Sequence, residues 1–191
     1  KFYDGAALNV EMVNDPVIAT GVIFTHYADD AVGGDTNGDG DRTAPEVNRY
    51  SLIGNIITDE TTQMRYLMLT TSGTLTSDVT WQPGATYHIT GDLTVPSGRT
   101  LRIPQGAIVK VAAQASVFVS RGGSMVVAGT AARPVVFTSL SDDAYSGDSN
   151  GDGSGTSAVR GDWGMVKVDG GTGTFTHCEV LYGGGVSVSG I

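Results

Sequence analysis

The stretch Leu93-Thr94-Val95-Pro96-Ser97-Gly98-Arg99-Thr100-Leu101-Arg102-Ile103 decides the fold of this chain. Two short apolar runs, Leu93–Val95 and Leu101–Ile103, flank a Pro-Ser-Gly corner. Because side chains alternate between the two faces of a strand, each run turns two apolar side chains to one side. The pattern returns 24 residues later in Val117–Val119 and Met125–Val127, around a second glycine corner. Such short strands, repeated with turn residues between them, are typical of successive coils of a β-solenoid.

Further strands are expected at Tyr87–Thr90, Ile108–Val111 and Val135–Phe137, again bounded by Gly, Pro or Ser. One coil cannot bury its inner face alone, so the coils must stack on one another. The chain divides into three expected parts: the end of a first solenoid-like module at 1–57, a junction at 58–80, and a main module at 81–191.

A second repeat joins distant parts of the chain. Phe24–Gly40 aligns without gaps on Phe137–Gly153, and eleven of the seventeen positions are identical. Each copy follows an apolar strand-like run. A match of this density indicates that one structural device is used twice.

The first copy leads into a loop, Asp35–Glu46, with the ligand pattern of a calcium site. Oxygen-bearing side chains stand at positions 1, 3 and 5, and glycine at position 6 allows a sharp turn. Position 7 offers a backbone carbonyl and position 12 a carboxylate, as in an EF-hand loop. The preceding β-strand and Pro45 argue against the flanking helices of a true EF-hand. The expected ligands are Asp35, Asn37, Asp39, the Asp41 carbonyl and Glu46, with Asp29 and Asp30 nearby.

The second copy, Asp148–Gly153, has the same spacing but Val159 at position 12, which cannot coordinate a metal. Ten of the twenty acidic residues lie in Asp29–Glu46 and Asp142–Asp152, where like charges repel one another unless a cation is present. The alternative interpretation is a solvated acidic turn, since Asp, Asn and Gly are turn formers. The expected ligands are Asp148, Asn150 and Asp152, completed by Asp142, Asp143 or Asp162.

Composition restricts the partners. The chain of 191 residues has a net charge of −9 and only 11 Lys and Arg, so it lacks the basic face that a nucleic acid requires. No apolar run approaches the roughly 20 residues that span a bilayer. A single cysteine, Cys178, excludes an intrachain disulfide. We therefore expect calcium to stabilise the long loops instead.

Several stretches resemble bacterial secreted and cell-surface proteins that contain right-handed parallel β-helix repeats and DxNxDG calcium loops. The residues that carry the resemblance are Gly91–Gly98, Thr100–Gly106, Pro134–Ser139, Gly161–Gly164 and Tyr182–Gly185. The resemblance implies an all-β, right-handed parallel β-helix with inserted calcium loops. It also implies an extracellular or cell-surface location. A resemblance of this kind is stronger evidence for the architecture of the chain than for its function.

The two ends of the chain, Phe2–Val10 and Leu181–Val188, look like versions of one coil. This predicts either head-to-tail stacking into a homo-oligomer or filament, or neighbouring modules of a longer chain. In both cases the function expected is that of a calcium-stabilised extracellular structural or interaction module.

Two alternatives from other classes stay open: a polysaccharide lyase or glycosidase, and a glycan-binding adhesin. A lyase would need a base beside the calcium, for which Arg42 and Arg160 are the nearest candidates in sequence. The three histidines, His26, His88 and His177, lack a clear nucleophilic partner, so no catalytic residue is assigned.

Overall fold

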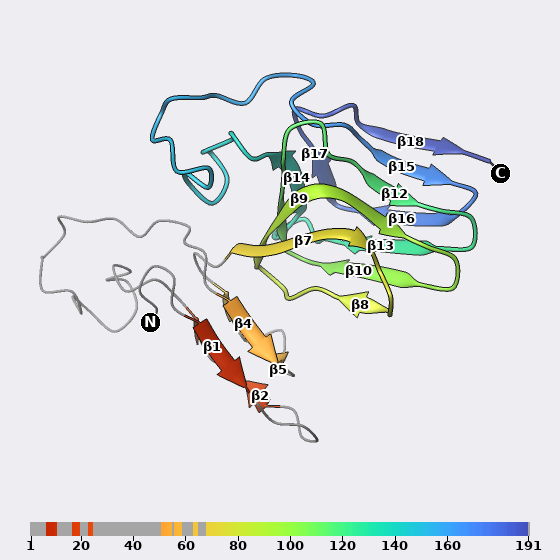
Figure 1. Ribbon diagram of the computed structural model, residues 1–191, viewed down its shortest axis with the longest axis horizontal. Helices are drawn as coiled ribbons and strands as arrows, with labels where there is room; N and C mark the ends of the chain where they lie inside the picture. Colours follow the sequence, from red (N-terminus) through yellow and green to blue (C-terminus); the bar gives the residue numbers. More distant parts are fainter. Residues whose placement is uncertain are drawn as a thin grey trace, which may run out of the picture.

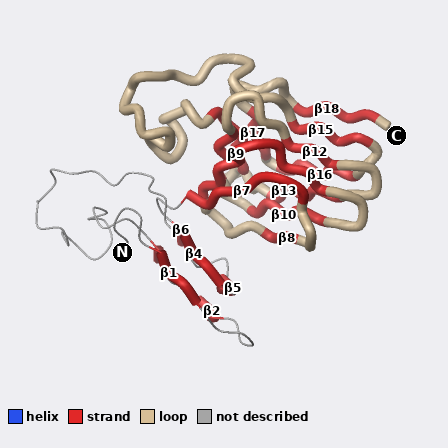
Figure 2. Tube along the Cα trace, viewed as in Figure 1, coloured by secondary structure: helices blue, strands red, loops and turns tan. Residues whose placement is uncertain are grey.

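The computed structural model describes residues 68–190 and six short strands upstream of them (Figures 1 and 2). Every strand pairing is parallel, and no helix occurs in the described part of the chain, so none there could cross a membrane. The architecture confirms the predicted all-β parallel β-helix. The upstream strands are β1 (Ala7–Val10), β2 (Val17–Ala19), β3 (Ile23–Phe24), β4 (Ser51–Gly54), β5 (Ile56–Thr58) and β6 (Gln63–Met64).

The main body has three sides, which we call faces A, B and C. Face A contains the start of β7 (Met68–Thr74), the first half of β9 (Thr86–Val95), β11 (Ile108–Val111), β14 (Val135–Ser139) and β17 (Cys178–Val180). Face B contains the end of β7, the second half of β9, β12 (Val117–Val119), β15 (Val166–Asp169) and β18 (Val186–Ser189). Face C contains β8 (Val79–Thr80), β10 (Thr100–Pro104), β13 (Ser124–Ala128) and β16 (Thr172–Thr176).

The 24-residue repeat is the register of neighbouring coils. Leu93 pairs with Val117 on face B, and Leu101 pairs with Met125 on face C. All four side chains are fully buried. Burying such a side chain contributes about 1.5–3 kcal/mol, so the stacked inner ladders supply most of the stabilisation. The predicted repeat and the pairing it implies are confirmed.

Two details differ from the strands expected from sequence. The runs Tyr87–Thr90 and Leu93–Val95 belong to one strand, β9, which bends near Gly91 and serves two faces. Strands β7 and β8 pair with β9 and β10, so the solenoid includes residues upstream of 81. Both differences arise because parallel pairing with the next coil extends strands past the local pattern.

The upstream strands repeat the topology of the main body. β1 pairs with β4, β2 with β5 and β3 with β6, just as β12 pairs with β15, β13 with β16 and β14 with β17. Residues 25–50 separate β3 from β4, and residues 140–165 separate β14 from β15. Both intervals are 26 residues long and separate equivalent strands in the two parts of the chain. The sequence repeat is therefore also a repeat of topology.

Glycines close the corner between faces A and B against a buried tryptophan. Trp163 is 1% exposed, and its Nε1 donates a hydrogen bond to the Leu181 carbonyl at 2.8 Å. A Cβ on Gly183 would lie 2.4 Å from Cε2 of Trp163, and one on Gly164 would lie 1.9 Å from Oγ of Ser116. A side chain at Gly183 would force the Trp163 ring to shift, and one at Gly164 would displace the Ser116 hydroxyl. This explains why the Gly-Asp-Trp-Gly and Gly-Gly-Gly stretches occur together.

We predict that Gly183→Ala lowers the free energy of unfolding by about 1–3 kcal/mol, because the added methyl overpacks the Trp163 ring. Urea denaturation followed by tryptophan fluorescence measures the change. Gly91→Ala is the matched control: its new methyl would meet only Ser72 at 3.9 Å, so the stability should change by less than about 0.5 kcal/mol. Equal stability of Gly183→Ala and the parent would contradict this account of the corner.

Candidate functional site

The insertion 140–165 leaves β14 and projects away from the strands before it returns to β15 (Figure 1). Part of it folds back on the outer side of face A. Thr86 Oγ1 and Ser146 Oγ share a hydrogen bond of 2.7 Å, and Tyr145 donates one of 3.1 Å to Glu179. The outward side chains of face A therefore form the surface on which the insertion packs, which we call the docking surface.

Lys110 lies at the centre of this docking surface. It points outward from β11, in register with His88 and Thr138, yet it is completely inaccessible to solvent. Its Nζ donates a hydrogen bond to the Asp142 carbonyl. A lysine at an outward position is ordinarily solvated, so its burial depends on the loop that covers it.

The charge on Lys110 faces several acidic residues. Burial lowers the pKa of the amine to about 8, while Asp142, Asp143 and Asp148 act in the opposite direction. Sequence reasoning did not identify this lysine. The one signal was its position between Val109 and Val111, where it interrupts an otherwise apolar strand.

The DxNxDG segment is wrapped around the carboxylate of Asp148. Its Oδ1 accepts hydrogen bonds from the backbone N–H of Gly151 at 2.7 Å and of Asp152 at 3.2 Å, and Oδ2 accepts one from Gly153 at 2.7 Å. These bonds, that from Gly153 foremost, lower the pKa of Asp148 and keep it ionised. A carboxylate has about four lone-pair sites, so one remains on Oδ2.

Two side-chain oxygens in this loop are buried without a hydrogen-bond partner: Oδ1 of Asn150 and Oδ1 of Asp143. The amide of Asn150 is oriented by hydrogen bonds from Nδ2 to Asp152 and Thr156, both 2.9 Å. Leaving a buried acceptor unpaired costs about 1–3 kcal/mol. Orphaned oxygens beside ionised carboxylates fit a hard cation, which binds oxygen ligands.

Asp143 has a strained electrostatic environment. Loss of hydration raises its pKa first, and the charges of Asp148 and Asp152 raise it further, against the opposing effect of Lys110. The carboxylates of Asp148 and Asp152 thus both lie close enough to Asp143 to repel its negative charge. A bound cation would remove that repulsion.

The two other residues considered for this site have structural roles. The carboxylate of Asp142 accepts hydrogen bonds from Thr138 Oγ1 and from the backbone N–H of Ala144. Asp162 accepts hydrogen bonds of 2.9 Å from Ser139 Oγ and from the Val159 N–H, and so closes the end of the loop. Their oxygens hold the insertion on the coil.

Within residues 68–190 no three His, Cys, Asp or Glu side chains converge tightly enough to hold a metal by themselves. A site here would require Asn150 and backbone carbonyls as well. The residues predicted for the first loop lie outside the described part of the chain: Asp29, Asp30, Asp35, Asn37, Asp39, Asp41 and Glu46.

The groups considered for catalysis lie on different parts of the solenoid. His88 lies on face A, His177 occupies the corner between β16 and β17, and Arg160 is exposed in the insertion. His26 and Arg42 fall outside the described residues. The Arg160-Gly161-Asp162 tripeptide contributes to the corner, because the N–H groups of Gly161 and Asp162 bond the Tyr182 carbonyl.

We predict that the stability supplied by Lys110 rises with pH. Its pKa is about 8 in the folded chain and near 10.5 when solvated, so between these values the folded state binds fewer protons than the unfolded state. Stability then increases with pH, by at most about 1.4 kcal/mol per pH unit. The difference in unfolding free energy between the parent and Lys110→Met, measured with urea and a chelator at pH 7 to 10, should rise above pH 8. A flat difference would contradict the burial of this amine.

Comparison with known proteins identifies the family. A family model described as a pectate-lyase-like β-helix domain matches residues 73–187. No curated protein and no solved structure gave a significant match. The matched region spans the stacked coils of faces A, B and C and the insertion between β14 and β15. The chain therefore belongs to the family of pectate-lyase-like β-helix domains.

Proposed function

We propose that this chain is a calcium-stabilised structural and interaction module of an extracellular protein. The observation that carries the proposal is the pair of buried, unpartnered oxygens on Asn150 and Asp143 beside the ionised carboxylate of Asp148. Calcium takes six to eight oxygen ligands from carboxylates, amide oxygens and carbonyls. The donor set is of that kind and contains no nitrogen or sulfur ligand.

The residues that would hold the ion are Asp148, Asn150, Asp152 and Asp143, with backbone carbonyls completing the shell. The ion would neutralise the repulsion that Asp148 and Asp152 exert on Asp143. Lys110 supplies one positive charge from the side of the insertion that faces the sheet. Its single ammonium group can pair with only some of these carboxylates. Its position supports a role in docking the loop rather than in replacing the ion.

The repeated topology supports a second, equivalent site. The segment with Asp35, Asn37, Asp39, Asp41 and Glu46 stands between β3 and β4, where the first copy of the insertion belongs. Extracellular calcium modules work with dissociation constants of about 10⁻⁴–10⁻³ M, which suits loops that must close in a calcium-rich medium. Two long insertions would thereby be pinned in a chain that has no disulfide.

We predict that calcium raises the melting temperature and that magnesium raises it less, because magnesium dehydrates reluctantly. A ligand that binds only the folded state adds about 2.7 kcal/mol at one hundred times its dissociation constant. Differential scanning fluorimetry in chelator, in millimolar calcium and in millimolar magnesium measures the shift. Identical melting in all three media would mean that the loops are acidic turns.

Calorimetry with single variants tests the same prediction at the level of ligands. The parent should bind two calcium ions, and Asp148→Ala or Asn150→Ala should remove one of them. Asp35→Ala should remove the other, and Glu46→Ala should weaken it. Asn150→Asp keeps an oxygen ligand and should retain binding, while Asp169→Asn on face B is the control outside both loops. Unchanged stoichiometry in Asn150→Ala would remove the main support for the calcium site around Asp148.

A second candidate role, end-to-end stacking, is favoured by the outer edge of the last coil. Val186 and Val188 on β18 are 44% and 59% exposed, although the equivalent inward positions Val166 and Val168 are buried by their neighbours. Exposed apolar residues on an open strand edge form a template for another strand. A further coil of the same kind, either from a second copy or from the continuation of a longer chain, would complete their burial.

We predict concentration-dependent association of the chain in calcium, weakened in the double variant Val186→Glu, Val188→Glu. Charges at these positions would have to be buried in the stacked state, at a large desolvation cost. Sedimentation velocity between micromolar and submillimolar protein measures the association. A monomer at every concentration, in both proteins, would exclude end-to-end stacking of this chain.

A further inference from the structure

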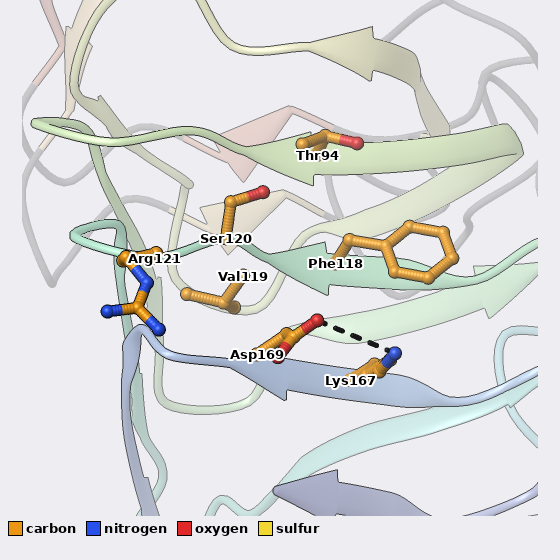
Figure 3. Close-up of a pocket in the computed structure, with 7 residues that line it drawn as sticks. All are labelled: Thr94, Phe118, Val119, Ser120, Arg121, Lys167 and Asp169. Carbon is orange, nitrogen blue, oxygen red and sulfur yellow. Dashed lines mark ion pairs between the residues drawn. The ribbon is translucent and has the colours of Figure 1, made fainter. Parts of the chain in front are cut away.

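The outer side of face B carries a hollow that the calcium proposal does not use. Thr94, Phe118 and Lys167 stand side by side on β9, β12 and β15, in register across the sheet. Together with Ser120, Arg121 and Asp169 they line a hollow of about 440 Å³, which Figure 3 shows at the end of the strands. That volume is within the range of sites for small molecules.

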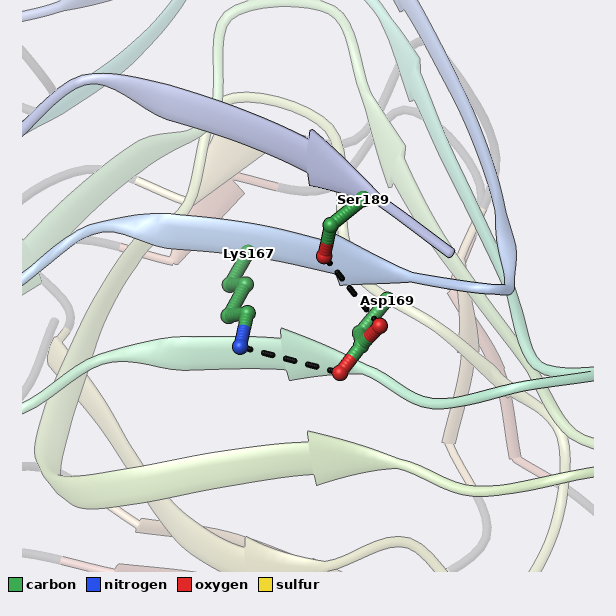
Figure 4. Close-up of polar contacts among 3 residues, drawn as sticks. All are labelled: Lys167, Asp169 and Ser189. Carbon is green, nitrogen blue, oxygen red and sulfur yellow. Dashed lines mark hydrogen bonds and ion pairs between the residues drawn. The ribbon is translucent and has the colours of Figure 1, made fainter. Parts of the chain in front are cut away.

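One side of the hollow is a polar pair with opposite hydrogen-bonding abilities. Lys167 Nζ lies 3.6 Å from Asp169 Oδ2, and Asp169 Oδ1 accepts a hydrogen bond of 3.1 Å from Ser189 (Figure 4). The Lys167 and Asp169 side chains remain 39% and 58% exposed. The structure thus holds a donor and an acceptor next to each other, both open to a ligand.

Phe118 forms the apolar part of the hollow. The side chain occupies an outward position between Thr94 and Lys167 and stays partly exposed, whereas its neighbours in the strand, Val117 and Val119, are buried in the core. A flat apolar surface beside a donor and acceptor pair is suited to a ligand with one apolar face and several hydroxyl groups.

We propose that this hollow binds a single neutral hexose unit of a glycan. Two adjacent hydroxyl groups can accept from Lys167 Nζ and donate to Asp169 Oδ2, since each hydroxyl does both. The C–H face of the ring packs on Phe118, and Arg121 donates at the far end. Asp169 offsets the charge of Lys167, while Arg121 adds one positive charge to the hollow. The net charge of −9 on the whole chain disfavours a polyanionic ligand.

The test is an NMR titration of the ¹⁵N-labelled chain with the methyl glycosides of glucose, galactose and mannose, and with galacturonic acid. A shallow site for about a dozen ligand atoms is expected to bind with a dissociation constant on the order of 1 mM. Shifts should be confined to residues of the hollow, with at least one neutral sugar bound more tightly than the uronic acid.

Variants distinguish this site from general surface binding. Phe118→Ala and Asp169→Asn should each weaken binding by about tenfold. Arg102→Gln, at an exposed outward position on face C, should leave binding and melting temperature unchanged. Absence of shifts with every neutral sugar, or unchanged binding in Phe118→Ala and Asp169→Asn, would overturn the proposal. Preference for galacturonic acid would overturn the neutral class. The titration is repeated in chelator. Sugar binding that is the same with and without calcium would show that the hollow on face B acts independently of the proposed calcium sites.

Discussion

The structure depends on the in-register stacking of inward apolar side chains between successive coils. Each coil contributes one residue to each ladder, as Leu93, Val117 and Val166 do on face B. Since the pairing is between coils, the length of chain that connects two strands matters little. Val117 and Val166 are 49 residues apart and still occupy neighbouring places. Insertions at the corners are therefore tolerated, provided that something holds them.

The outer side of face A shows how one insertion is held. Outward side chains that would otherwise meet water, among them Thr86, Lys110 and Thr138, bond to residues of the insertion. This docking brings carboxylates together and buries an amine among them. The arrangement leaves oxygens unpaired on Asn150 and Asp143, a cost that a cation would offset. The charge distribution of the loop and the calcium proposal thus have one common origin.

Faces A and B use the same backbone for different purposes. On face A the outward row is covered by the insertion, while on face B Thr94, Phe118 and Lys167 stay partly exposed around a hollow. Strand β9 runs through both faces, so the difference does not originate in this strand. It lies in the insertion 140–165, which folds back on the outer side of face A and leaves the outward residues of face B partly exposed.

The sequence by itself determined the coils, their register and the repeated loop, because alternation, corner glycines and ligand spacing are local patterns. It also located the oxygen-rich segment around Asp148. Only the tertiary structure decided that Lys110 is buried, that Asp142 and Asp162 hold the loop in place, and that Gly183 must admit the Trp163 ring. The physical reason is that the surroundings of an outward or corner residue are set by segments distant in the chain. Coil stacking brings those segments together, and a local sequence pattern does not indicate which distant segment will cover a given residue.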